Sequence, residues 1–148
     1  MNFLKIHQNY FVLLLFAILI ALFYGNTLLN DFVHDDIGII VNNPNVHSLS
    51  SIPKAFTTCF FEYVFGSCEE TMQYRPVQSL SYILTWQISS LPWVFHLVNL
   101  AYFLTGAFLV FVFVRMLTRK FFVSFLTALI FVAHPINNEV VNWIAAVP

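Results

Sequence analysis

Two adjacent carboxylates are the clearest candidates for chemistry in this chain. Asp35 and Asp36 follow His34 in the stretch Asn30–Pro44, which reads NDFVHDDIGIIVNNP. Adjacent side chains diverge from a strand or a helix, so the two acids do not readily address one atom. One could deprotonate a hydroxyl group, while Asp36 with His34 could orient a partner or hold a divalent metal ion. A solvated acidic loop is the competing interpretation.

Other polar residues are candidates for binding a substrate. Arg75 carries a guanidinium, which suits bidentate recognition of phosphate, although an ion pair with a neighbouring acid (Glu69 or Glu70) is the simpler interpretation. His96 and Asn99 are three residues apart and share a helix face, where they would line a cavity or join two helices.

His134 and Glu139 flank Pro135 and are five residues apart, which is not a one-face metal-ligand spacing. Glu139 is either a second functional carboxylate or a solvated acid on an interfacial helix. A proton or ion path through His96 and Glu139 is a weaker hypothesis, because both residues are expected near the outer edge of the membrane.

The composition defines the class of protein that must position these residues. The chain has 148 residues, of which 59% are hydrophobic and 9% are charged. Soluble domains average about 25% charged residues, and the mean hydropathy here is +0.80. The chain is therefore expected to be an integral, multi-pass membrane protein. A net charge of −1 gives no basis for binding nucleic acid.

The apolar runs predict an all-α membrane protein with about three transmembrane helices and two or three interfacial helices, because a span needs roughly 20 apolar residues. Residues 33–41 are rich in β-branched residues and are expected to form a short extended piece. The expected elements are spans at 10–29, 93–114 and 121–134, an outer loop at 30–92 with interfacial helices at 52–61 and 76–90, and an outer amphipathic helix at 135–148.

The basic residues predict the orientation. Lys5 precedes the first span, and Arg115, Arg119 and Lys120 lie in the 115–120 turn, so residues 1–9 and this turn are expected in the cytoplasm. The acidic loop then faces the periplasm, the exterior or a lumen. Such compartments are oxidising, so a Cys59–Cys68 disulfide in this loop is plausible, but the spacing alone leaves the pairing open.

The order of the segments resembles a known family. After the first span come FVHDD, VNNPNV, IPKAF, YRPVQSLSY, FHLVNL and AHPINNEVVNWI, covering the chain from about Phe32 to Ile144. This set resembles the membrane half of the GT-C glycosyltransferases, specifically the tetratricopeptide-containing protein O-mannosyltransferases and their bacterial relatives. The resemblance implies the N-terminal part of a GT-C-like helix bundle.

The resemblance also implies an inverting sugar transfer from a polyprenyl-phosphate donor to a hydroxyl-bearing acceptor, a protein or a glycan. Asp35 and Asp36 match the family's essential acidic pair, with Asp35 expected to be the general base. His96 matches the F-H-L-x-N element, and His134 and Glu139 match H-P-x-x-x-E. From its charge, Arg75 is expected near the donor phosphate.

Two departures narrow this expectation. The family usually continues with a G-R-x-D-type sequence, where this chain reads Ala145-Ala146-Val147-Pro148, and the soluble repeats are absent. The chain is therefore expected to be incomplete at its C-terminus, and residues 1–148 alone are expected to be inactive. The alternative is a small non-enzymatic membrane protein or accessory subunit, in which changing Asp35 has no effect.

Overall fold

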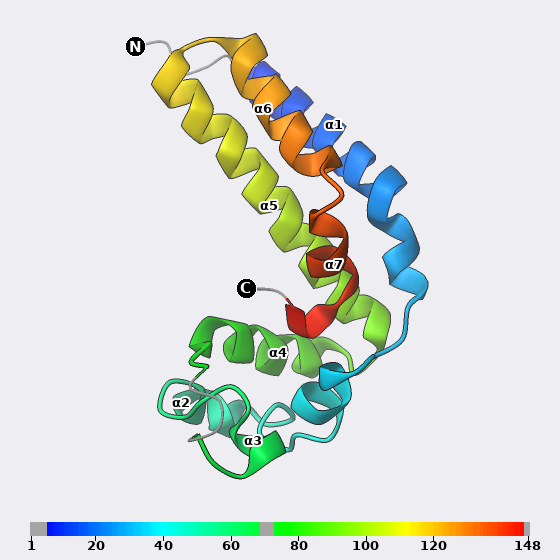
Figure 1. Ribbon diagram of the computed structural model, residues 1–148, viewed down its shortest axis with the longest axis vertical. Helices are drawn as coiled ribbons and strands as arrows, with labels where there is room; N and C mark the ends of the chain where they lie inside the picture. The colour runs from blue at the N-terminus through cyan, green and yellow to red at the C-terminus, as the bar shows by residue number, and fades with distance from the viewer. Residues whose placement is uncertain (1–5, 69–72, 147–148) are drawn as a thin grey trace.

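The computed structural model describes residues 6–68 and 73–146 and is all-helical within them, which confirms the expected all-α class. Three apolar helices lie side by side at one end of an elongated molecule, and the outer loop forms a compact module at the other (Figure 1). The helices are α1 (Ile6–Tyr24), α2 (Ile52–Ala55), α3 (Glu62–Phe65), α4 (Pro76–Ile88), α5 (Pro92–Thr118), α6 (Phe121–Ala133) and α7 (Asn137–Asn142).

Two of these helices are long and apolar enough to cross a membrane. The first runs from His7 to Leu29 through the 3₁₀ turn η1 (Gly25–Leu29), and the second is α5, with 27 residues. Only 28% and 22% of their apolar stretches are buried, whereas the core helix of a soluble protein would be mostly buried. Helix α6 has 13 residues and is therefore about 20 Å long, shorter than the roughly 30 Å hydrocarbon core.

The three apolar helices share one core. It is formed by aromatic and small side chains that interlock between α1, α5 and α6, and Tyr24 adds a polar tie by donating a hydrogen bond to the Val132 carbonyl oxygen at 3.0 Å. The buried members on these helices are Val12, Phe16, Ile20, Tyr24, Leu100, Phe103, Ala107, Phe111, Ala128 and Val132.

The start of α1 and the turn between α5 and α6 lie at the same end of the bundle (Figure 1). In that turn Arg119 adopts a left-handed conformation (φ 58°), and Arg115 donates a hydrogen bond to its carbonyl oxygen at 2.9 Å. A cationic side chain at a helix C-terminus offsets the helix dipole and satisfies a free carbonyl. The hydrogen bond from Arg115 therefore determines the shape of the basic turn. Lys5, the other basic residue used to predict the orientation, lies outside the described residues.

The outer loop has its own apolar core, made of residues far apart in the sequence. Its buried members are Ile39, Ile40, Val46, Phe60, Tyr82, Phe95, Ile144 and Ala145. The prediction of an extended piece at residues 33–41 is wrong: Ile37–Val41 form a π-helical turn, η2. The adjacent residues Ile39 and Ile40 are both buried, which a strand could not achieve with a single buried face.

The predicted helix at residues 52–61 is wrong in its extent, because α2 ends at Ala55 and α3 begins only at Glu62. After α2, the hydroxyls of Thr57 and Thr58 donate hydrogen bonds to the Lys54 carbonyl oxygen at 3.2 and 3.1 Å. Such bonds compete with continuation of a helix. The Phe60 backbone N–H then donates to the Gln73 carbonyl oxygen at 2.8 Å, outside any helix. Helix α3 resumes two residues later.

Helix α4 lies within the predicted helix at residues 76–90 and begins at Pro76, which needs no hydrogen-bond partner for its nitrogen. Its buried face is unusually polar and includes Gln78, Tyr82 and Thr85, whereas Val77 and Ile88 are exposed. A helix with polar groups turned inward and apolar groups turned outward suits a position beside lipid.

The predicted helix at residues 135–148 is wrong in its extent, and residues 147–148 lie outside the described part of the chain. Helix α7 ends after six residues. Trp143 is then extended, and η4 (Ile144–Ala146) follows. The chain breaks because Ile144 and Ala145 are buried in the outer-loop core, where their carbonyl groups bond to α4.

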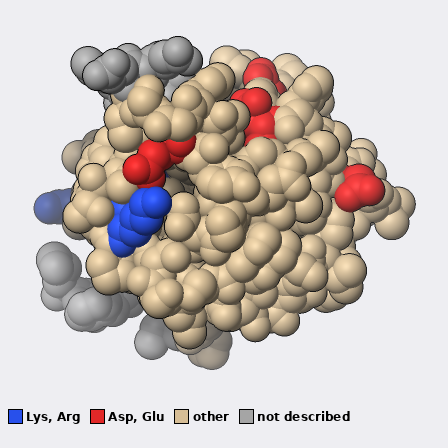
Figure 2. Space-filling view, turned by 90° about the horizontal axis from the view of Figure 1, so that it is seen from below, with Lys and Arg blue, Asp and Glu red and all other residues tan. Residues whose placement is uncertain are grey.

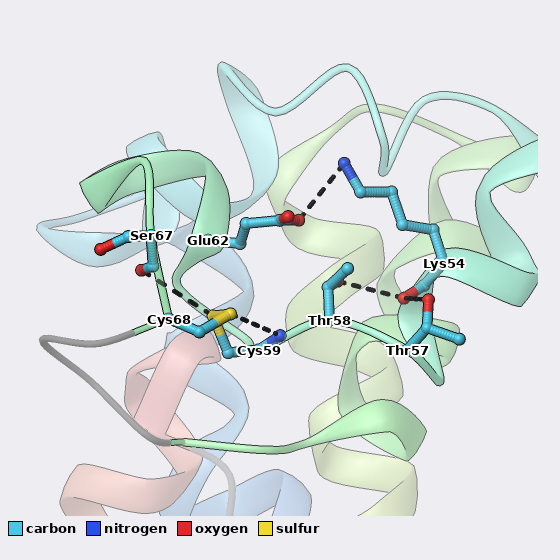
Figure 3. Close-up of a disulfide and its surroundings, with 7 residues drawn as sticks. All are labelled: Lys54, Thr57, Thr58, Cys59, Glu62, Ser67 and Cys68. Carbon is cyan, nitrogen blue, oxygen red and sulfur yellow. Dashed lines mark hydrogen bonds and ion pairs between the residues drawn. A yellow bond between two sulfur atoms is a disulfide. The ribbon is translucent and has the colours of Figure 1, made fainter.

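A disulfide joins Cys59 and Cys68 across the α3 segment, with the two Cα atoms 5.6 Å apart (Figure 3). The structure therefore contains the Cys59–Cys68 disulfide, which the spacing of the cysteines alone could not decide. Lys54 and Glu62 form an ion pair at 3.2 Å beside it. Both ties hold the turn that carries Phe60 into the outer-loop core.

Replacing both cysteines with serine should destabilise this part of the loop by about 2–3 kcal/mol, because the bond removes chain entropy from the unfolded loop. The measurement is the rate of limited proteolysis between residues 59 and 68 in detergent, compared with the parent protein with and without reductant. Equal cleavage rates for the variant and the oxidised parent would contradict this prediction.

Candidate functional site

The two adjacent acids have opposite environments. Asp35 is exposed, whereas the side chain of Asp36 is fully buried. His34 precedes them with φ 48°, a left-handed conformation that histidine adopts more readily than most residues. This turn directs one acid outward and the next inward. The divergence expected from adjacency is therefore present.

Asp36 is held by two backbone N–H groups. Its Oδ2 accepts a hydrogen bond from Val33 at 3.1 Å, and its Oδ1 accepts one from Ala145 at 2.8 Å. Burial raises the pKa of Asp36, and the two hydrogen bonds only partly oppose that change. The bond to Ala145 spans 109 positions of the sequence, so this carboxylate joins the first outer segment to the last.

Helix α4 holds the other side of the same terminal segment. Tyr82 donates a hydrogen bond to the Ile144 carbonyl oxygen at 2.8 Å. Gln78 donates from Nε2 to the Tyr82 hydroxyl at 2.7 Å and to the Ala145 carbonyl oxygen at 3.3 Å. Burial raises the pKa of Tyr82, so its hydroxyl stays protonated and remains a donor.

Arg75 belongs to this network. Its Nη1 donates to Gln78 Oε1 at 3.3 Å and to the Ala145 carbonyl oxygen at 3.4 Å. Its guanidinium also lies over the Phe60 ring, 5.4 Å from the centroid. Ala145 thus bonds through its N–H to Asp36 and through its carbonyl to Arg75. Glu69 and Glu70, the alternative partners for Arg75, lie outside the described residues.

His96 is placed apart from this network, where the first membrane helix ends. Its side chain is fully buried, and its Nδ1 lies 3.1 Å from the hydroxyl of Thr27 in η1. This contact joins the end of α1 to the start of α5. A hydrogen bond between two helices is one of the two interpretations of His96, and the Thr27 contact agrees with it.

His134 and Glu139 are both exposed and do not contact each other through any bond among the described residues. His134 Nδ1 accepts a hydrogen bond from the Ile136 backbone at 3.2 Å. The segment after Pro135 does reach the acidic loop, but through other residues. The Trp143 ring lies 6.1 Å from that of His34, and Ala145 bonds to Asp36.

A metal site involving His34 and Asp36 finds no further ligands in the described part of the chain, where no three or more His, Cys, Asp or Glu side chains are placed so that together they could hold a metal ion. Both carboxylate oxygens of Asp36 already accept backbone N–H groups. The charged groups at this end of the molecule are sparse and lie in separate patches (Figure 2).

Reasoning from the sequence missed Gln78, Tyr82 and the segment Ile144–Ala145. The first two follow Arg75 at i+3 and i+7, so all three share one helix face. That spacing could have identified them. The backbone groups of Ile144 and Ala145 carry no such signal, because any residue provides them.

Comparison with known proteins identifies homologues that are protein O-mannosyl-transferases. The chain is 32% identical over 124 residues to Protein O-mannosyl-transferase TMTC1 of Mus musculus, covering 82% of this chain and 13% of the relative. It is 32% identical over 119 residues to Protein O-mannosyl-transferase TMTC2 of Homo sapiens (80% and 14%). For Protein O-mannosyl-transferase Tmtc2 of Drosophila melanogaster the identity is 30% over 142 residues (93% and 15%).

The chain thus spans 13 to 15% of the length of these curated relatives. No protein-family model matches the chain. No solved structure matches it either. The likeness covers most of this chain, including the acidic loop and α4, but only a small part of each transferase.

Proposed function

We propose that this chain is the N-terminal membrane portion of an inverting glycosyltransferase that moves a sugar, mannose, from a polyprenyl-phosphate donor to a hydroxyl group of a protein. The names of its homologues support a mannosyl donor and a protein acceptor. The observation that carries the proposal is the arrangement at Ala145, whose two backbone groups hold Asp36 and Arg75.

Asp35 acts as the general base in this proposal. It is the exposed member of the pair, so an acceptor hydroxyl can approach it, and its backbone is fixed because Asp36 is anchored. The carboxylate takes the hydroxyl proton as the oxygen attacks the anomeric carbon. The bond from that carbon to the phosphate oxygen breaks, and the phosphate leaves with the negative charge.

Arg75 contributes the positive charge near the leaving group. Its guanidinium is held by Gln78, Ala145 and the face of Phe60, so it is pre-positioned rather than free to rotate. A fixed cation stabilises the charge that develops on a departing phosphate. His96, His134 and Glu139 remain proposed substrate-binding residues outside this network, and a divalent metal ion is not required by these steps.

The proposed orientation puts the N-terminus and the basic turn in the cytoplasm, with the acidic loop on the lumenal or outer face. The start of α1 and the basic turn lie at one end of the bundle, as this topology requires (Figure 1). The disulfide lies at the opposite end, where an oxidising compartment would sustain it.

The test is sugar transfer by a longer membrane protein that contains this region. Purified protein is mixed with polyprenyl-phosphate mannose and a serine- and threonine-containing acceptor, and the product's anomeric configuration is determined by NMR. We expect transfer with inversion, because a single displacement inverts the attacked carbon. Residues 1–148 alone should give no turnover. No transfer by the longer protein would favour a non-enzymatic membrane subunit, and retention would exclude a single displacement.

A further inference from the structure

We infer that Tyr82, assisted by Gln78, is a positioning residue that holds the carboxyl group of Asp36 and the guanidinium of Arg75 in one fixed arrangement. The inference rests on the proposed function and adds to it two residues that contact no substrate in that mechanism. It follows from the way in which three separate segments meet at Ile144 and Ala145.

Two side chains of α4 hold the segment Ile144–Ala145 in place. Ile144 and Ala145 follow the extended residue Trp143 and are not held by a long helix. Their carbonyl oxygens accept hydrogen bonds from Tyr82 at 2.8 Å and from Gln78 at 3.3 Å, both on α4. Because Tyr82 also accepts the 2.7 Å hydrogen bond from Gln78, the two side chains act as one clamp.

The positions of Asp36 and Arg75 both depend on this clamp. The Ala145 N–H donates to Asp36, and the Ala145 carbonyl accepts from Arg75, so a shift of this residue moves both groups. Asp35 is bonded directly to Asp36 in the chain and would move with it. In catalysis a displacement of about 1 Å can lower a rate about 100-fold.

The hydroxyl and the ring of Tyr82 have separate roles. The Tyr82 side chain is 3% exposed, and its ring packs 6.3 Å from that of Phe95 in the outer-loop core. Tyr82→Phe keeps this packing and removes only the donor to Ile144 and the acceptor for Gln78. The variant therefore separates positioning from folding.

The experiment uses the longer membrane protein with polyprenyl-phosphate mannose as the probe. We expect Tyr82→Phe to lower kcat by about 10-fold and to change the KM for the donor by less than about 2-fold, since the clamp acts on geometry and does not touch the substrate. Gln78→Met should act in the same direction. The matched control is Tyr102→Phe, which loses an exposed hydrogen bond of 2.9 Å to Ser81 outside the network.

A double-mutant cycle completes the test. In an Asp36→Asn background, where the link to Ala145 is already weakened, Tyr82→Phe should have a smaller effect than in the parent protein. Additive effects, or a Tyr82→Phe variant as active as Tyr102→Phe, would overturn the inference. If the parent protein transfers no sugar, or Asp35→Asn is fully active, the proposed function has failed instead.

Discussion

Asp36→Ala should destabilise the outer loop by about 2–4 kcal/mol, because it leaves the buried Ala145 N–H without an acceptor and weakens the turn at Val33. The variant should still insert into membranes, since the apolar helices pack through a separate core. The measurement is amide hydrogen exchange: protection should fall at Ala145 and in α4 and remain unchanged within α1 and in α5 from Leu100 to Phe111, which pack in the separate core.

Comparing Asp36→Asn with Asp36→Ala separates the effect of the charge of Asp36 from the effect of its hydrogen bonds. Its amide oxygen can still accept one of the two N–H groups, and it carries no charge. Because burial raises the pKa of Asp36, the folded loop binds this proton more tightly than the unfolded loop does. The contribution of Asp36 to stability is therefore present at low pH and declines as the pH rises through the raised pKa.

The two variants should consequently differ with pH. Relative to the parent, Asp36→Asn should be less destabilising at neutral pH than at acidic pH, and at every pH less destabilising than Asp36→Ala. The midpoint of thermal unfolding in detergent measures this. An Asp36→Ala protein with parental protection at Ala145 would show that the bond between the first and last outer segments is unimportant.

The long apolar helices of the bundle could be predicted from the sequence. The start of α5 and both bounds of α6 follow from hydropathy, from Pro92 and from the basic residues between the two helices, all of which are local signals. The predicted turn at 115–120 is too long, because α5 continues through Arg115 to Thr118. Helix α4 was predictable for the same reason, because Arg75-Pro76 marks its start.

The outer loop could not be predicted to the same degree, because its conformation depends on contacts between distant segments. The β-branched residues 33–41 favour a strand locally, yet the π-helical turn there buries Ile39 and Ile40 together against the rest of the loop. Residues after Asn142 are helical in pattern, but burial of Ile144 breaks the helix. In both places tertiary packing outweighs local preference.

In the candidate site, too, local features could be predicted from the sequence, whereas features that depend on distant contacts could not. Adjacency alone predicted that Asp35 and Asp36 diverge, but which of them is buried depends on Ala145, 109 positions after Asp36. Arg75 was singled out for its charge, whereas its link to the acid through a backbone residue has no sequence signature. His134 and Glu139, matched by motif, lie outside the hydrogen-bond network in the described residues.

Asp35→Asn should lower sugar transfer by at least about 100-fold, since a general base contributes about 100- to 10,000-fold and an amide cannot accept the proton. The fold should be unaffected, because the exposed Asp35 side chain makes no bond to other described residues. The loss should appear in kcat rather than in the KM for the donor, because the base acts only as the acceptor attacks.

The most direct measurement is the initial rate of mannose transfer by Asp35→Asn beside that of Asp31→Asn, at equal amounts of the longer protein. Asp31 is also an exposed acid of this loop, and its side chain accepts a hydrogen bond from the neighbouring Phe32 N–H at 2.9 Å. If Asp35 is the general base, Asp31→Asn should transfer mannose at the parental rate, whereas the rate of Asp35→Asn should fall to about one hundredth of the parental rate or less. Equal rates for the two variants would contradict it.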